Sequence, residues 1–181
     1  MMKQYDILDK NGNITGKTTD IRTLHDRNFY HRAVQIWIYN DGYLILQKRS
    51  PKVRSYPNKY EASASGHVES NEESITTAIR ETREELGIKL EIDDLKLLFH
   101  FFADEEYNRE FRDVYLVTKK VILDQNKYLN KEVSGILKIS LKDYENLVKS
   151  NYQNDIDNEF IHQPGNYNDQ LILKIKEIVI W

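Results

Sequence analysis

Three glutamates near the middle of the chain are spaced as ligands of a divalent cation would be. Glu81, Glu84 and Glu85 lie in the segment GHVESNEESITTAIRETREELGI, which covers residues 66–88. On a helix of about 3.6 residues per turn, their carboxylates fall within an arc of about 100°. Like charges at this spacing repel one another by about 0.2–0.5 kcal/mol per pair, and a bound cation offsets that repulsion. Mg²⁺ is commonly held by carboxylates together with water and substrate phosphates. The cluster therefore predicts an Mg²⁺ or Mn²⁺ site that binds a diphosphate.

The same segment contains signals for the helix that positions these acids. Ser70, followed three residues later by Glu73, has the form of a capping box at a helix start. Gly87 suits the position just past the last turn. These signals predict a helix of about 16 residues. Its apolar residues have the spacing of one buried stripe: Ile75, Ala78, Ile79 and Leu86, with Thr82 between them.

Patterns elsewhere in the chain predict an α/β protein with a layered arrangement and a mixed sheet. Strands are expected at residues 4–8, 33–39, 43–48, 60–65, 95–102, 111–118 and 135–140. Asn40-Asp41-Gly42 is typical of a hairpin turn. Further helices are expected at residues 141–149 and 169–179.

Composition limits the classes of function. A length of 181 residues suits a single domain, 1–181, with an amino-terminal extension (1–32), a core (33–150) and a final loop and helix (151–181). The net charge of −3, with dispersed Lys and Arg, argues against a nucleic-acid surface. The chain has neither the run of about 20 apolar residues that spans a membrane nor a signal peptide at its start. We expect a cytoplasmic protein that binds neither nucleic acid nor membrane, and a homodimer remains open.

The polar residues of the 66–88 segment resemble the Nudix box. This motif marks a superfamily that mostly hydrolyses a nucleoside diphosphate linked to another moiety. All of its fixed positions are matched, by Gly66, Glu72, Arg80, Glu81, Glu84, Glu85 and Gly87. A chance match has a probability on the order of 10⁻⁸ per starting position, which makes an ordinary solvated acidic helix a poor explanation. Thr82 departs from the pattern, because the family usually has an aliphatic residue there.

The resemblance implies a fold, a substrate and roles for the motif residues. The fold would be a Nudix-type α/β/α sandwich, and the substrate a small-molecule diphosphate, such as a nucleoside diphosphate derivative. Glu84 and Glu85, helped by Glu81 and the Gly66 carbonyl, would hold Mg²⁺. Arg80 would orient Glu81 or neighbouring carboxylates by charge-assisted hydrogen bonds. The general base would be Glu81 or an acid outside the motif such as Glu110.

Segments outside the box are similar to isopentenyl-diphosphate isomerase and its hydrolase relatives, over roughly residues 4–118. They include YDILDKNGNITGK, HRAV at 31–34, LQKR at 46–49 and Tyr56-Pro57. Among the basic residues Arg49, Lys52 and Arg54, which could hold diphosphate oxygens, the resemblance favours Arg49. The alternative for these three is an ordinary charged loop.

The isomerases themselves need a cysteine just before the box glycine. Ser65 occupies that position, and the chain has no cysteine. A serine hydroxyl is a poor replacement for a thiol in acid–base catalysis. The isomerase metal site draws on histidines and a glutamate pair, for which this chain offers only Glu110 and Asp113 beside its histidines.

The histidines in question are His25, His31 and His67. A lone histidine is more often a structural hydrogen-bonding group than a metal ligand. We therefore expect an Mg²⁺-dependent Nudix hydrolase, with the isomerase and a non-catalytic diphosphate-binding module as alternatives. The leaving moiety would be recognised by the loops at 104–109 and 151–168, which have no recognisable motif.

Overall fold

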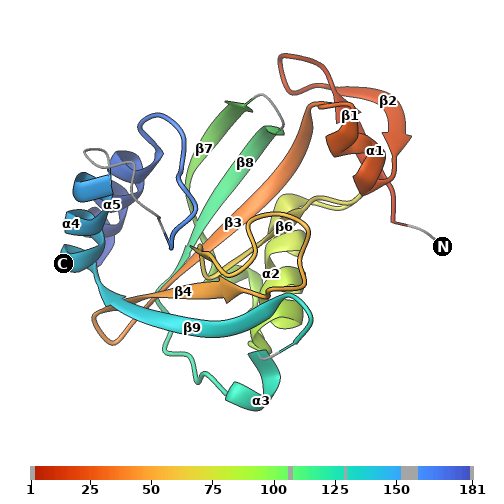
Figure 1. Ribbon diagram of the computed structural model, residues 1–181. Helices are drawn as coiled ribbons and strands as arrows, with labels where there is room; N and C mark the ends of the chain where they lie inside the picture. Colours follow the sequence, from red (N-terminus) through yellow and green to blue (C-terminus); the bar gives the residue numbers. More distant parts are fainter. Residues whose placement is uncertain (1–2, 106–107, 129, 152–158, 180–181) are drawn as a thin grey trace.

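A computed structural model describes residues 3–105, 108–128, 130–151 and 159–179 (Figure 1). The strands are β1 (Tyr5–Leu8), β2 (Ile14–Thr19), β3 (His31–Asn40), β4 (Tyr43–Arg49), β5 (Tyr60–Glu61), β6 (Ala64–His67), β7 (Lys96–Glu105), β8 (Asn108–Val117) and β9 (Val133–Ser140). The helices are α1 (Ile21–Asp26), α2 (Ser74–Leu86), the 3₁₀ turn η1 (Ile92–Asp94), α3 (Gln125–Tyr128), α4 (Leu141–Asn151) and α5 (Tyr167–Val179). None of the helices in the described ranges is long and apolar enough to cross a membrane.

The main sheet is mixed, as predicted. Within the described residues it has seven strands, in the order β5-β4-β3-β8-β7, with β6 also paired to β3 and β9 to β4. β3 runs parallel to β8 and antiparallel to β4 and β6. The two antiparallel partners divide β3 between them, because β6 pairs with residues 33–36 and β4 with residues 38–40. The strand expected at 60–65 is accordingly split into β5, which pairs with β4, and β6, which pairs with β3.

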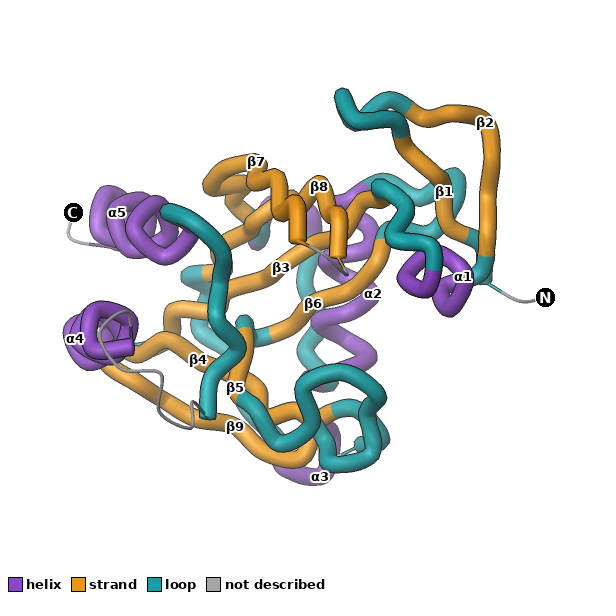
Figure 2. Tube along the Cα trace, turned by 45° about the horizontal axis from the view of Figure 1, so that its top comes forward, coloured by secondary structure: helices purple, strands orange, loops and turns teal. Residues whose placement is uncertain are grey.

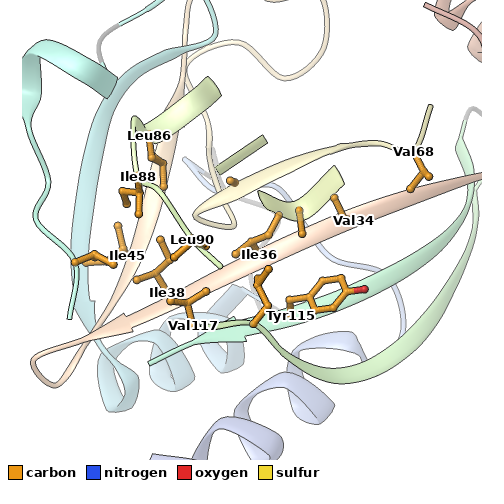
Figure 3. Close-up of a cluster of buried hydrophobic side chains, with 14 residues drawn as sticks. Val34, Ile36, Ile38, Ile45, Val68, Leu86, Ile88, Leu90, Tyr115 and Val117 are labelled. Atoms are coloured by element: carbon orange, nitrogen blue, oxygen red, sulfur yellow. The ribbon is translucent and has the colours of Figure 1, made fainter. Parts of the chain in front are cut away.

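Alternating side chains of β3 pack into cores on opposite faces of the sheet. One face holds Val34, Ile36 and Ile38, which pack with Ala78 and Leu86 of α2 (Figure 3). The other face holds Trp37, which packs in a core with residues of α4 and α5. Figure 2 shows α4 and α5 together on one side of the sheet and α2 on the other. The fold is therefore an α/β/α sandwich, which confirms the predicted class.

The hairpin turn and the end of α2 follow the predicted geometry. Asp41 and Gly42 both have positive φ angles, 50° and 90°, as the tight connection between β3 and β4 requires. Gly87 ends α2 in the left-handed region at φ 68°, and its N–H donates to the Arg83 carbonyl. Thr82 is fully buried in the apolar stripe, and its hydroxyl donates to the Ala78 carbonyl.

The predicted capping box is wrong. α2 begins at Ser74, with Glu73 at the N-cap and no side-chain cap bond. The Ser70 hydroxyl instead donates to the Asp6 carboxylate on β1. The Ser70 side chain thus bonds to a residue distant in sequence and does not cap the helix. As a result α2 has 13 residues, fewer than the roughly 16 predicted. The sequence patterns also did not predict β2, α1 or α3.

Candidate functional site

A cavity of about 750 Å³ lies where β6, α2, the β4–β5 loop and the segment before α5 come together. Its lining includes the motif residues Gly66, Glu81, Glu84 and Glu85, together with Arg49 and Glu110. These six line one cavity together with other residues singled out from the sequence, among them His25, Ser65 and His67. Its volume is within the usual range for small-molecule sites.

Arg80 holds Glu81 at the edge of this cavity. Its Nη1 lies 2.6 Å from Glu81 Oε1, and its Nε and Nη2 donate to the two oxygens of Glu72 at 3.1 and 3.0 Å. Charge-assisted hydrogen bonds of this kind fix the orientation of a carboxylate. The contact predicted between Arg80 and Glu81 is present, and Glu72 provides the anchor for the guanidinium.

Glu85 and Glu84 differ in exposure although they are neighbours on α2. Glu85 is 5% exposed, and its Oε2 accepts from the Ser65 N–H at 3.0 Å and from Gln47 Nε2 at 2.9 Å. The Glu84 side chain is 53% exposed at the cavity rim, with Arg80 Nη1 3.5 Å from its Oε2. The arrangement gives one buried carboxylate held by two hydrogen bonds and one exposed carboxylate with a single longer ionic contact among those described.

Burial disfavours the charged forms of Glu81 and Glu85 when no cation is bound. Burial raises the pKa of Glu81 to about 7 despite the Arg80 contact. Burial, and then the charges of Glu61 and Glu81, raise the pKa of Glu85 well above its ordinary value. Carboxylate oxygens are the ligands that Mg²⁺ and Mn²⁺ prefer, and a cation favours the charged form of such groups. The residues present therefore fit a divalent cation.

Three histidines assemble beside the same cavity, which His25 and His67 line. Ring nitrogens of His25 on α1, His31 on β3 and His67 on β6 all lie within 4.8 Å of one another. The Nε2 atoms of His25 and His67 are 3.1 Å apart, and those of His31 and His67 lie 3.5 and 3.6 Å from Glu110 Oε1. The prediction that His25 and His31 are structural hydrogen-bonding groups did not anticipate that both lie beside His67.

The neutral ring of His25 and the His31 nitrogen that is unpartnered among the described residues suit a metal ligand role. Burial, and then His67 and His31, lower the pKa of His25 to about 4, so its ring is neutral near neutral pH. His31 Nδ1 lies 2.8 Å from the Phe29 carbonyl, and its buried Nε2 has no hydrogen-bond partner in the described structure. Ligand atoms around tetrahedral Zn²⁺ lie roughly 3.3 Å apart. Three imidazoles and one carboxylate at these separations could hold a transition-metal ion.

Glu110 belongs to this cluster and is strongly ionised. Although burial opposes its charge, the Arg112 guanidinium and the imidazoles of His31 and His67 hold its pKa well below the ordinary value. Arg112 Nε lies 2.5 Å from Glu110 Oε2, and Arg112 Nη1 lies 3.0 Å from Gln163 Oε1. Asp113, the other acid named from the sequence, instead lies 2.6 Å from His100 Nδ1. A carboxylate so well stabilised is a weak general base.

The basic residues at the end of β4 and in the loop after it divide into one that lines the cavity and two outside its described lining. Arg49 lines it, with Nη1 2.5 Å from Glu61 Oε1 and Nε 2.9 Å from the Ser55 carbonyl. Arg54 pairs with Asp26 of α1 at 2.9 Å, with a side chain 72% exposed. Lys52 is exposed in the β4–β5 loop. Of the three, Arg49 has the geometry to meet a substrate in the cavity.

Gln47 and Glu61 also belong to the site, although the sequence patterns did not select them. Both are buried, and Gln47 sits in the apolar run of β4 beside Leu46. A buried amide costs free energy unless it is hydrogen-bonded. The presence of Gln47 within the apolar run of β4 could therefore have indicated a buried hydrogen-bonding partner. The loops at 104–109 and 151–168, expected to recognise the leaving moiety, fall partly outside the described residues.

The family model and the relatives that match this chain agree on one family. Residues 29–161 match the model of the NUDIX domain. Nudix hydrolase 3 of Arabidopsis thaliana is 33% identical over 156 residues, which cover 81% of this chain and 20% of that protein. An uncharacterised Nudix hydrolase of Listeria monocytogenes is 29% identical, covering 82% of this chain and 86% of its own. The chain thus spans about a fifth of the length of the Arabidopsis relative.

A solved structure shows the same fold. The crystal structure of DR0079 from Deinococcus radiodurans superposes with a TM-score of 0.67 at 22% identity, over 95% of this chain and 98% of that one. Similarity at this identity supports the α/β/α architecture described above.

Proposed function

The chain belongs to the Nudix hydrolase family, whose members hydrolyse pyrophosphate bonds in small molecules, and we propose that it is an Mg²⁺-dependent diphosphatase acting on a nucleoside diphosphate derivative. The observation that carries the proposal is the convergence of Glu81, Glu84 and Glu85 in one cavity with Arg49. This set combines anionic ligands for a cation with a guanidinium that can bind phosphate oxygens.

The cation would be held by Glu84 and Glu85, with Glu81 and the Gly66 carbonyl completing the protein ligands. A divalent cation there polarises a phosphoryl oxygen and makes hydroxide available near neutral pH. Glu85 is fixed by the Ser65 N–H and by Gln47, so one oxygen of its carboxylate is already committed. The exposed Glu84 can adjust when substrate phosphates enter.

Glu81 is the better of the two candidate general bases. Burial raises its pKa to about 7 in the metal-free protein, and a bound cation would lower it, so that the ionised carboxylate could take a proton from water near neutral pH. Arg80 holds one oxygen, Oε1, at 2.6 Å, which leaves the other oxygen for the reacting water. Glu110, with its lowered pKa and its Arg112 partner, would accept a proton less readily.

Arg49 would bind the diphosphate oxygens that the cation leaves free. Glu61 and the Ser55 carbonyl engage its Nη1 and Nε, so that the remaining Nη2 edge can donate to phosphate. Arg54 and Lys52 lie farther out and would contribute only long-range attraction, which salt screens.

Isopentenyl-diphosphate isomerisation is the second candidate activity. The cluster of His25, His31, His67 and Glu110 is the observation that favours it, because the isomerase resemblance implies a histidine-rich metal site. Against it stands Ser65, which provides a hydroxyl where the isomerase requires a thiol. Hydrolysis needs a cation, the carboxylates that would hold it and the guanidinium, and all of these side chains line the cavity.

The test is a panel of diphosphate compounds incubated with Mg²⁺ or Mn²⁺ and followed by release of phosphate-containing products. The panel should include nucleotide sugars, dinucleoside polyphosphates and isopentenyl diphosphate. At least one nucleoside compound should be hydrolysed, and Glu85→Gln should slow that turnover by at least about 10³-fold, since it weakens the cation site. Glu177→Gln on the exposed face of α5 is the control. The proposal fails if no compound is cleaved or if Glu85→Gln matches the unaltered protein.

A further inference from the structure

Gln47 is a buried amide whose two N–H hydrogens face two different carboxylates. It lies on β4, is 1% exposed, and is flanked by the fully buried Leu46. Its Nε2 lies 3.2 Å from Glu61 Oε1 and 2.9 Å from Glu85 Oε2. An amide nitrogen has two hydrogens, so Gln47 can donate to both acceptors at once. Gln47 therefore connects β5 to the box helix α2.

Glu61 continues this connection to Arg49. Its Oε1, which accepts from Gln47, also lies 2.5 Å from Arg49 Nη1. The Glu61 side chain is 7% exposed and that of Arg49 is 22% exposed, so little water competes for the contact. Charge-assisted bonds of this kind are short and directional. Glu61 thus fixes the guanidinium in one orientation.

Together these contacts form one chain of hydrogen bonds from Arg49 through Glu61 and Gln47 to Glu85. Each end has a backbone anchor as well, because the Ser55 carbonyl lies 2.9 Å from Arg49 Nε and the Ser65 N–H lies 3.0 Å from Glu85 Oε2. Both end residues line the cavity, whereas Gln47 lies behind its described lining. Gln47 can therefore act on a substrate only through its neighbours, whereas Glu61 also lines the cavity between the two ends.

We propose that Glu61 and Gln47 are positioning residues that hold Arg49 and Glu85 in a fixed relative position. The phosphate-binding guanidinium and the metal-binding carboxylate are then placed to meet the same diphosphate. The inference rests on the proposed function, since it takes Arg49 to bind phosphate and Glu85 to bind the cation. A diphosphate must meet both groups at once, and small misplacements in such sites reduce turnover strongly. Linking the two groups removes their independent motion before the substrate arrives.

A purely structural role is the competing explanation. Gln47 and Glu61 would then serve only to satisfy buried polar groups, and their loss would lower stability without a selective effect on either end. A double-mutant cycle separates the two explanations, because residues that act through each other have non-additive effects. The cycle pairs Glu61→Ala with Arg49→Ala and, separately, with Glu85→Gln.

The readouts are the KM of the panel compound that the unaltered protein hydrolyses fastest and the dissociation constant of Mn²⁺ alone, measured by electron paramagnetic resonance. Glu61→Ala should raise both by about tenfold, the value of one charge-assisted hydrogen bond. In the Arg49→Ala background its effect on KM should fall below about twofold. In the Glu85→Gln background its effect on Mn²⁺ binding should fall likewise.

Glu61→Gln keeps an oxygen that accepts from both donors, so it should recover most of the lost affinity while preserving the fold. The inference is overturned if the effects of Glu61→Ala are fully additive in both backgrounds, or if the variant lowers only the melting temperature. A different result marks failure of the proposed function: Arg49→Ala and Glu85→Gln would themselves leave KM and Mn²⁺ binding unchanged, which removes the inference as well.

Discussion

The Cα of Gly66 lies directly against the carboxyl group of Glu81, so that a Cβ at position 66 would come within 2.3 Å of Glu81 Cδ. Gly66 has no unusual backbone angle that would require glycine. The close approach of β6 to α2 is therefore the reason for a glycine at the start of the motif. Any larger residue must displace Glu81 from Arg80 and from the cavity.

Gly66→Ala should lower kcat by at least about 10²-fold, because displacement of a catalytic group by even one ångström is costly. The matched control is Gly135→Ala on β9, where the added Cβ would meet Lys48 Cβ at an ordinary 3.6 Å. Steady-state kinetics and circular dichroism on both variants make the comparison. Equal activity of the two variants would show that the Gly66–Glu81 contact is dispensable.

Glu84→Gln should reduce turnover by at least about 10³-fold while thermal stability holds or rises slightly. The side chain is 53% exposed, so its replacement leaves the core unchanged, and the amide relieves repulsion among the three acids. Glu73→Gln at the other end of α2 is the control, since its side chain makes no cap bond. Near-normal turnover of Glu84→Gln would remove this carboxylate from the cation site.

The pH dependence of stability should reveal the raised pKa of Glu81. Burial moves this pKa from 4.5 to about 7 on folding, so the group's contribution to stability is fully present below pH 4.5 and is lost as the pH rises through 7. Glutamine does not titrate. We therefore compare the melting temperatures of Glu81→Gln and the unaltered protein in the presence of a chelator. The value for the variant minus that for the unaltered protein should increase by roughly 5 °C between about pH 5 and pH 8.

Excess Mg²⁺ should reduce that gain, because a bound cation favours the ionised carboxylate and stabilises the folded protein by mass action. A difference in melting temperature that does not change with pH would refute the raised pKa.

Much of the site could be predicted because its acids share one helix. Glu81, Glu84 and Glu85 lie within five residues of one another, and helical geometry alone gathers them. The histidine cluster could not be predicted this way, because α1, β3 and β6 bring its members together only through tertiary packing. Gln47 and Glu61 were missed for the same reason.

The error at the start of α2 has a related cause. A capping box is a local pattern, and Ser70 fits it, but Asp6 lies 64 residues away and takes the hydroxyl. The strands were predicted more accurately than this helix start, because the pattern of apolar residues along a strand reflects which of its side chains are buried. Of the described strands, only β2 was not predicted, because five of its six residues are exposed and it has no pattern of buried apolar residues.

The histidine cluster predicts transition-metal binding that is independent of the box carboxylates. His67→Asn should weaken Zn²⁺ binding by at least about 10²-fold, since it removes one ligand of a small set. His100→Asn, whose side chain is 74% exposed beside Asp113, is the control. Calorimetric titration with Zn²⁺ measures both. Unchanged affinity in His67→Asn would return these histidines to a structural role.

The origin of the oxygen in the product tests hydrolysis most directly. The reaction of the best panel compound is run in ¹⁸O-labelled water, and isopentenyl diphosphate is incubated in deuterated water in parallel. Attack of water on phosphorus, assisted by Glu81 and the cation site, predicts ¹⁸O in a phosphate-containing product and no deuterium in the carbon skeleton. Deuterium in isopentenyl diphosphate, with no ¹⁸O in any phosphate product, would contradict the account and show that the protein performs carbon protonation with Ser65 in place of a thiol.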